Sequence, residues 1–411
     1  METYTLITIL ITLSAVFAYV NHRFIKLPFV IGLFVLSTVI SLIIISSKLW
    51  VSHPYEIIRD IVSQTNISRF ILNIMLGFLL FAGALHTNWN SIKPQMKLIS
   101  LYAGAGVILS TILVAFLFYY ICVLFNLQIN FIYCLLFGAL ISPTDPIAVL
   151  GILKKANVPK KIEATIIGES LFNDGVGVVL FITLLETLQS GNGQINYSRF
   201  AFLLLREGGG GIVFGLALGF ILHQLLKSIE HYQTEILLTL SFVMFGYTLC
   251  SYIHVSGPIM TVVMGLMVGS YKRDETLSSI SKQHIYDFWE VIDVILNAVL
   301  FILIAFVLVI IEFKIAYIYI GLVTVVLVLL ARLLVILFPK IVFPRIASFT
   351  NRQAGLIVWG GLHGGLSIAL VLSLPEGDAK KLILITTYIC VLFGIIVQGL
   401  TIEKMAKRIK D

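Results

Sequence analysis

Thirteen stretches of nearly uninterrupted apolar residues recur along the chain, separated by short polar segments. An α-helix needs about 20 such residues to cross roughly 30 Å of hydrocarbon, and all but one of the stretches come close to or exceed that length. The pattern therefore predicts an all-α membrane protein with about thirteen transmembrane helices. The predicted spans cover residues 4–21, 28–46, 69–88, 98–125, 131–153, 163–188, 201–227, 233–253, 257–271, 286–311, 315–338, 354–374 and 381–402.

Composition supports this interpretation. Hydrophobic residues occupy 59% of the 411 positions and charged residues 12%, which is about half the charged share of a typical soluble domain. Soluble nucleic-acid-binding proteins, disordered chains and disulfide scaffolds are excluded, despite a net charge of +7. We expect one membrane domain over residues 1–411, no soluble domain, and the lipid bilayer as its surroundings.

The distribution of lysine and arginine residues between the loops indicates how the chain is oriented in the membrane. Nineteen of the 28 lysine and arginine residues fall in the loops on one side of the predicted bilayer, and eight fall on the other. Because cytoplasmic loops are enriched in basic residues, the C-terminus is predicted to be cytoplasmic. An odd number of spans then places the N-terminus outside.

Proline interrupts the span predicted at 131–153. Pro143 and Pro146 flank Asp145, and each proline removes a helical N–H and clashes with the preceding turn. Freed carbonyl groups are tolerated at membrane depth only where they are buried in protein or line a wet cavity, and there they can coordinate cations. A proline kink in which a polar residue satisfies stray donors remains the alternative.

A second interruption is predicted in the span at 354–374. Two glycine pairs, Gly360-Gly361 and Gly364-Gly365, flank His363. This span lies seven after the first interrupted one, so the two run in opposite directions. Interrupted helices in antiparallel, corresponding positions are typical of inverted-repeat transporters that bind their substrate near the bilayer midplane.

Between these interruptions, the span at 163–188 carries polar residues on one face. Glu169, Ser170, Asn173 and Asp174 fall within about 140° of the helix circumference. Ionisable residues at membrane depth are costly and are functional candidates by default. Asp174 lies near the middle of its span and is the strongest of them.

Three motifs carry a family resemblance: Thr144-Asp145-Pro146, Glu169-Ser170 with Asn173-Asp174, and Trp359-Gly360-Gly361-Leu362. Together they resemble sodium/proton antiporters of the bacterial NhaP type, relatives of the animal sodium/proton exchangers. The resemblance implies thirteen spans, two unwound helices that cross, an inverted repeat and a homodimer in the bacterial cytoplasmic membrane, with a role in pH homeostasis. It also implies a core around 131–188 and 354–402, with the remaining helices as scaffold.

The resemblance and the ligand chemistry lead to one mechanism. Asp174 is expected to carry either the cation or the proton, while Asp145, Ser170 and Thr144 complete the oxygen ligands and Asn173 orients them. Competition for Asp174 then couples the two fluxes without any cofactor. In the family, an asparagine at the position of Asn173 goes with electroneutral one-for-one exchange. The helix crossing is expected to be supported by Glu169, His363, Pro143 and Pro146.

Two departures from the family pattern affect these expectations. Many relatives carry an arginine where this chain has His363, so Glu169 and His363 are expected to form a pH-sensitive pair, or else His363 is neutral and bonds to the carbonyls freed by the neighbouring glycines. Arg332 is expected to pair with a nearby acid or to reach the membrane interface. Some relatives also carry an acidic residue where this chain has Ala82. The acidic residues that start the span at 286–311 can supply negative potential instead, although a solvated helix end is the preferred interpretation; they are Asp287, Glu290 and Asp293.

Other functions share some of these sequence features. A K⁺/H⁺ antiporter shares the same ligand types. An intramembrane aspartyl enzyme needs two carboxyl groups that share a proton, and its known pattern places a glycine before one aspartate, whereas Asn173 and Thr144 hold those positions here. A sensor built on a transporter fold would be expected to lack the titratable residue or to add a signalling domain.

Overall fold

The computed structural model describes residues 2–48, 67–145, 158–189, 197–270, 279–312 and 314–409, with isolated residues at 55, 56, 59, 153 and 156. Pro146 and residues 147–152 of the span predicted at 131–153 lie outside the described residues. Within the described part the chain is helical, and the only β-type pairing there is a single antiparallel bridge between Asp145 and Leu362. The predicted all-α class is confirmed.

Ten helices in the described part are long and apolar enough to cross a membrane. They are α1 (Glu2–Val20), α2 (Phe29–Ser47), α4–η2–α5 (Ile67–Phe70, Ile71–Met75, Leu76–Leu85), α6–η3–α7–η4–α8 (Trp89–Ile92, Lys93–Gln95, Met96–Ser100, Leu101–Gly106, Val107–Leu124), α11 (Lys160–Gln189), α12 (Tyr197–Lys227), α13 (Tyr232–Ile253), α15 (Ser279–Ile310), α16 (Ile315–Val342) and α19–η6–α20 (Asp378–Leu392, Phe393–Gln398, Gly399–Ala406). Four shorter helices are α9 (Phe131–Ile141), α14 (Gly257–Ser270), α17 (Asn351–Trp359) and α18 (Gly365–Leu372).

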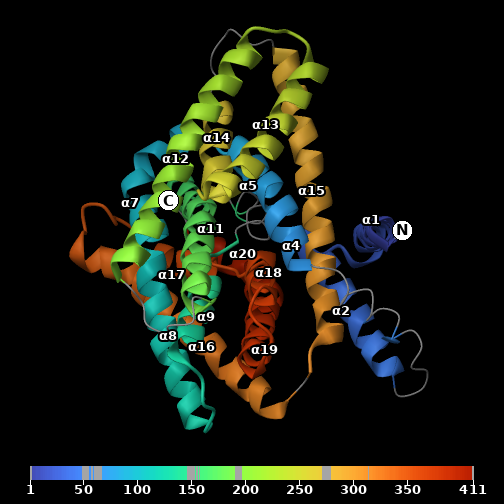
Figure 1. The fold of residues 1–411 in the computed structure, drawn as a ribbon, viewed down its shortest axis with the longest axis vertical. Helices are drawn as coiled ribbons and strands as arrows, with labels where there is room; N and C mark the ends of the chain where they lie inside the picture. Colours follow the sequence, from blue (N-terminus) through green and yellow to red (C-terminus); the bar gives the residue numbers. More distant parts are fainter. Residues whose placement is uncertain are drawn as a thin grey trace.

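The helices form two groups that meet at α11. Helices α5, α12, α13 and α14 gather with the first half of α15 toward one end of the molecule, and α8, α9, α16, α18 and α19 gather toward the other (Figure 1). The first group has its own buried cluster around Trp289, Phe81 and Met260. A larger cluster joins the second group to α2 and α15. Helix α1 packs against α2 and α15 at the periphery.

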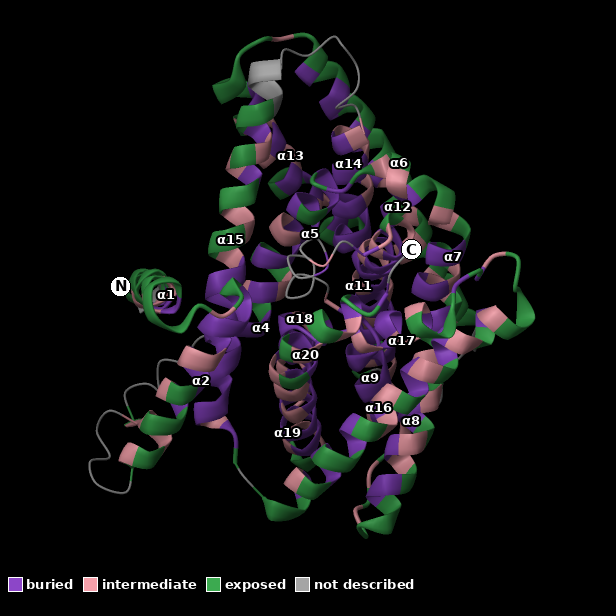
Figure 2. Ribbon diagram, turned by 180° about the vertical axis from the view of Figure 1, so that it is seen from behind, coloured by how far each residue is buried: buried purple, intermediate pink, exposed green. Residues whose placement is uncertain are grey.

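The outer surface of the helices is apolar. Large hydrophobic side chains are exposed along α12, α13 and α16, while purple buried positions concentrate toward the interior in Figure 2. On α16, for example, Ile315 is 73% exposed and Tyr319 58%. Such a surface is unfavourable in water and is suited to hydrocarbon.

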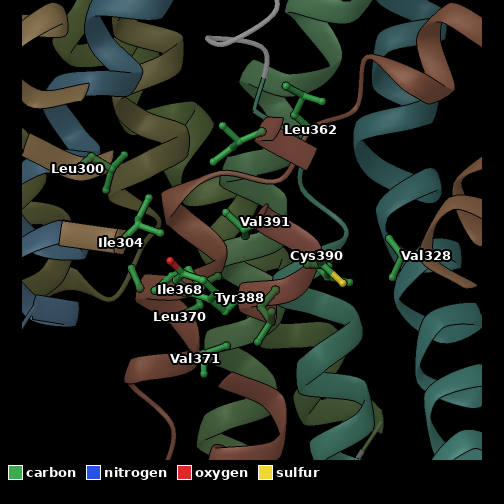
Figure 3. Packing of buried hydrophobic residues seen from close by; sticks show 14 of the residues in the cluster. Leu300, Ile304, Val328, Leu362, Ile368, Leu370, Val371, Tyr388, Cys390 and Val391 are labelled. Atoms are coloured by element: carbon green, nitrogen blue, oxygen red, sulfur yellow. The ribbon is translucent and has the colours of Figure 1, made fainter. Parts of the chain in front are cut away.

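Helix α18 packs closely against α15. Leu300 and Ile304 of α15 face the α18 region, where Ile368 is fully buried (Figure 3). A Cβ atom at Gly365, the first residue of α18, would lie 2.5 Å from Leu300 Cδ1 and 2.8 Å from Ile304 Cδ1. Only glycine permits this approach, so Gly365 fixes how closely α18 meets α15.

Candidate functional site

Helix α9 ends at Ile141, and the chain continues without helical structure through Asp145. Pro143 explains the end, because it has no N–H to donate and its ring clashes with the preceding turn. The Ser142 hydroxyl turns back and donates to the Gly138 carbonyl at 2.7 Å. Gly177 of α11 lies beside this point, and a Cβ atom there would collide with the Pro143 ring. The α9 end therefore lies directly against α11.

Helix α17 ends at Trp359, and α18 begins at Gly365. The linking residues meet the end of α9: the Asp145 amide donates to the Leu362 carbonyl at 2.7 Å. His363 Nδ1 lies 3.3 Å from the Pro143 carbonyl oxygen, and the Ser367 hydroxyl donates to the Leu140 carbonyl at 2.8 Å. Two non-helical segments more than 200 residues apart in the sequence are therefore bonded to each other.

Arg332 satisfies the carbonyl groups freed where α17 ends. Its Nε and Nη2 atoms each donate at 3.2 Å, to the carbonyls of Val358 and Ile357. Its Nη1 atom lies 3.1 Å from Glu169 Oε1, and both side chains of this ion pair are buried. Arg332 thus joins α16, α17 and α11.

This contact corrects one expectation and confirms another. Glu169 pairs with Arg332, not with His363, whose ring contacts the Pro143 carbonyl. The physical reason is that a guanidinium offers five donors in a fixed fork, enough to reach one carboxylate and two carbonyls at once. The expectation that Arg332 pairs with a nearby acid is confirmed.

Residues of α11 hold the segment that follows α9. The Ser170 hydroxyl donates to the Thr144 carbonyl. Asn173 Nδ2 donates to Thr144 Oγ1 at 3.1 Å, and Asn173 Oδ1 accepts from the Thr144 amide at 3.4 Å. The Asn173 amide therefore contacts Thr144 with both of its ends, and Ser170 and Asn173 fix the chain immediately before Asp145.

A cavity of about 720 Å³ opens beside these residues. Asp174, Asp145, Ser170 and Pro143 line it together with residues of α5, α15 and α18. Two carboxylates and a hydroxyl are hard oxygen ligands, suited to a hard cation. Among the described residues, no three His, Cys, Asp or Glu side chains cluster as metal ligands, so a cation here would rely on a mixed set of oxygens.

Sequence reasoning singled out only part of the cavity wall. Glu290 and Asp293 of α15 line the cavity, which agrees with the alternative that they supply negative potential. Glu290 is also exposed, as the preferred interpretation of a solvated helix end expects. Their i, i+3 spacing was the available signal. Asp287 fits the solvated interpretation, since it is exposed and accepts a hydrogen bond from Gln283 at 2.6 Å. Ala82 also lines the cavity, together with two residues that the sequence did not single out, Thr87 and Glu163.

Comparison with known proteins identifies a family. Residues 10–408 match the model of the family described as sodium/hydrogen exchanger, transmembrane. The chain is 43% identical to the Na⁺/H⁺ antiporter NhaP of Pseudomonas aeruginosa over 98% of this chain and 96% of the relative. It is 30% identical to the Na⁺/H⁺ antiporter NhaH of Halobacillus dabanensis over 82% of this chain and 83% of the relative.

A solved structure shares the fold. The sodium proton antiporter MjNhaP1 from Methanocaldococcus jannaschii superposes with a TM-score of 0.76 over 99% of both chains, at 19% sequence identity. At that identity the likeness concerns the arrangement of the helices.

Proposed function

The chain belongs to the sodium/hydrogen exchanger family and is an antiporter rather than an enzyme, and we propose that it exchanges Na⁺ for H⁺ through competition of the two ions for Asp174. The alternative of an intramembrane aspartyl enzyme is thereby set aside. The observation that carries the proposal is the position of Asp174 in the cavity wall, beside Asp145 and the non-helical segment that follows α9.

The chemistry of one carboxylate supports the coupling. Removal from water favours the protonated form of a carboxyl group, whereas a bound cation favours the charged form. Asp174 therefore holds a proton or a cation, with Asp145, Ser170 and the Thr144 oxygens as further ligands. If only the loaded forms cross between the inward-open and outward-open states, each Na⁺ that moves one way requires a proton to move the other way. No resident cofactor takes part.

The finer architecture is part of the same proposal. The four shorter helices complete the ten long ones as three further spans, giving thirteen, with α9 and α17–α18 as the interrupted and crossing members of an inverted repeat. The N-terminus lies outside and the C-terminus in the cytoplasm. The protein forms a single transport domain, assembles as a homodimer and resides in a bacterial cytoplasmic membrane, where it contributes to pH homeostasis.

The primary test is exchange by purified protein in proteoliposomes. An imposed Na⁺ gradient is expected to drive proton movement, recorded with an enclosed pH-sensitive dye. Asp174→Asn is expected to reduce this movement to the level of empty vesicles, whereas Asp287→Asn, which removes an exposed carboxylate, keeps the native rate. Native exchange by Asp174→Asn would overturn the competition mechanism. A response to K⁺ gradients that exceeds the response to Na⁺ would favour the K⁺/H⁺ alternative.

Asn173 motivates the proposed one-for-one stoichiometry. Electroneutral exchange moves no net charge, so a membrane potential set by K⁺ and valinomycin in the absence of a Na⁺ or pH gradient is expected to drive no Na⁺ uptake. Uptake of ²²Na⁺ that follows the imposed voltage would exclude the neutral stoichiometry.

A further inference from the structure

Ser367 lies in the first turn of α18, where this helix meets the end of α9. The residue is 2% exposed, and it lines the same cavity as Asp174 and Asp145. The Ser367 hydroxyl donates to the Leu140 carbonyl of α9 at 2.8 Å. A buried hydroxyl group is therefore fixed at the cavity wall by α18, a helix that contributes no oxygen to the cation ligands proposed above.

The bond between Ser367 and Leu140 follows from the break in α9. In an uninterrupted helix the Leu140 carbonyl would accept from the amide of Thr144. That amide donates instead to Asn173 Oδ1 at 3.4 Å, which leaves the Leu140 carbonyl to accept from Ser367. The interruption that frees backbone groups beside Asp145 therefore also fixes the position of the Ser367 hydroxyl.

The proton of the Ser367 hydroxyl is already used. A serine hydroxyl has one O–H donor and two lone pairs that can accept. The donor is taken by the Leu140 carbonyl, and within the part of the chain that the structure describes Ser367 Oγ accepts no hydrogen bond. An oxygen in this state can accept a hydrogen bond from water or coordinate a cation, but it cannot donate to a carboxylate. It therefore favours a positively charged neighbour.

Ser367 lies on the face of α18 that is directed to Asp145. A Cβ atom on Gly364, the residue before α18, would lie 2.3 Å from Asp145 Oδ2. Residues three apart share one face of a helix, so Ser367 follows Gly364 on that face, roughly one turn further along. A hard cation with contacts of about 2.4 Å joins oxygen atoms up to roughly 5 Å apart. One cation at Asp145 is therefore within reach of this hydroxyl.

We propose that Ser367 Oγ is a ligand of the transported cation and sets its selectivity among monovalent cations. The hydroxyl oxygen is a hard, neutral ligand, and hard cations take several oxygen ligands at once. Because Ser367 carries no charge, it affects which cation binds rather than the competition with protons, which depends on Asp174. The inference rests on the proposed function and deepens it by naming a residue of α18 that selects the cation.

The test exchanges a hard ligand atom for a soft one at position 367. Ser367→Cys keeps a donor for the Leu140 carbonyl but replaces oxygen by sulfur, a weak acceptor and a soft ligand. Uptake of ²²Na⁺ into proteoliposomes, driven by an imposed pH gradient in nitrate buffers, gives the KM for Na⁺. Tl⁺, a softer cation, is added as a competitor and gives an inhibition constant. Ser367→Cys is expected to raise the KM for Na⁺ by about three- to tenfold and to lower the inhibition constant of Tl⁺.

The ratio of these two constants distinguishes a ligand from a structural role. If Ser367 only supports the end of α9, its replacement weakens both cations together and leaves the ratio native, which overturns the inference. Ser367→Thr keeps a hydroxyl oxygen and is expected to keep the ratio within about twofold of native. A changed ratio in Ser367→Cys that Ser367→Thr does not show supports the proposed ligand.

Ser142→Cys is the matched control. The Ser142 hydroxyl is also buried and also donates to a carbonyl of α9, that of Gly138, at 2.7 Å. Ser142 is not among the described residues that line the cavity, so the same exchange there is expected to leave the ratio within about twofold of native. Equal changes in the two cysteine variants overturn the inference, because they would assign the effect to the end of α9.

Monodisperse elution of each purified variant establishes that it folds. If Ser367→Cys fails this criterion, Ser367→Ala replaces it, and loss of the hard oxygen is then expected to raise the KM for Na⁺ more than the inhibition constant of Tl⁺. A native ratio in the variant at position 367, with Asp174→Asn inactive, overturns this inference alone. Native exchange by Asp174→Asn overturns the proposed function instead.

Discussion

The guanidinium of Arg332 makes four hydrogen bonds to the Glu169 carboxylate and to two backbone carbonyls. Nη1 and Nη2 reach the two Glu169 oxygens at 3.1 and 3.4 Å, while Nε and Nη2 reach the carbonyls at the end of α17. A buried ion pair gains little over an apolar replacement, but removal of one partner leaves a buried charge without compensation. The value of this pair therefore lies in the geometry that it fixes between α11, α16 and α17.

Glu169→Gln is expected to destabilise the protein by about 3–5 kcal/mol, because Arg332 stays charged and buried. The measurement is thermal or denaturant unfolding of the purified protein in detergent. Glu403→Gln is the control: it breaks the Glu403–Lys407 pair, whose side chains are 50% and 63% exposed, and it is expected to cost no more than about 1 kcal/mol. Equal losses in the two variants would contradict this account of Arg332.

The sequence did not reveal which residue pairs with Glu169. Asp174, Ser170 and Asn173 could be selected from one helix, since helical spacing alone places them on one face. Glu169 and Arg332 are separated by 163 positions, and no local pattern indicates which of two candidate cations reaches a carboxylate. One expectation for His363 was a contact with the carbonyls of its neighbouring glycines. Its ring instead contacts the carbonyl oxygen of Pro143, which is distant in the sequence.

At the scale of elements, local chemistry explains where helices end, and tertiary packing explains where the ends meet. Pro143 accounts for the end of α9, and Gly360, Gly361 and Gly364 lie in the link between α17 and α18. That these two segments meet was expected only from the family resemblance, because glycine and proline specify what a backbone cannot do rather than which partner it finds. The spacing of Glu290 and Asp293 places them on one face of α15 but does not show that this face lines a cavity, because the cavity exists only after several helices have packed.

Substitution of Gly364 by alanine is expected to be far more damaging than the same substitution at another glycine nearby, Gly355. A methyl group at Gly364 would meet the Asp145 carboxylate, whereas nothing lies within 4 Å of the corresponding position at Gly355 of α17. Gly364→Ala is therefore expected to lower the exchange rate at least tenfold. Gly355→Ala is expected to keep the native rate and to add up to about 1 kcal/mol of stability, the usual gain for alanine in a helix. Exchange in proteoliposomes and unfolding temperature measure the two effects, and a native rate for Gly364→Ala would contradict the predicted clash.

At the scale of the whole molecule, the orientation can be tested with cysteine labelling. The native cysteines Cys122, Cys134, Cys250 and Cys390 are all buried, so they are expected to react slowly with a membrane-impermeant maleimide. Lys407→Cys, near the C-terminus, is expected to react only in inside-out vesicles, and Gln128→Cys, in the exposed link between α8 and α9, only in right-side-out vesicles. The reverse pattern would invert the topology derived from the basic residues.

The overall architecture was the most predictable level. Apolar length and low charge are sufficient to predict helices that cross a bilayer, because hydrocarbon permits few other ways to satisfy the backbone. The ten long helices among the described residues overlap the spans predicted for them. The cavity was less predictable, because its walls come from helices that are distant in the sequence.

The bond between the Asp145 amide and the Leu362 carbonyl has a consequence for mutagenesis. Both atoms belong to the main chain, so replacement of either side chain leaves donor and acceptor in place. An alanine scan would pass over this contact and report only the loss of the Asp145 carboxylate. Its contribution becomes visible only when the backbone itself is altered, as when an ester linkage introduced by semisynthesis replaces the peptide N–H at position 145.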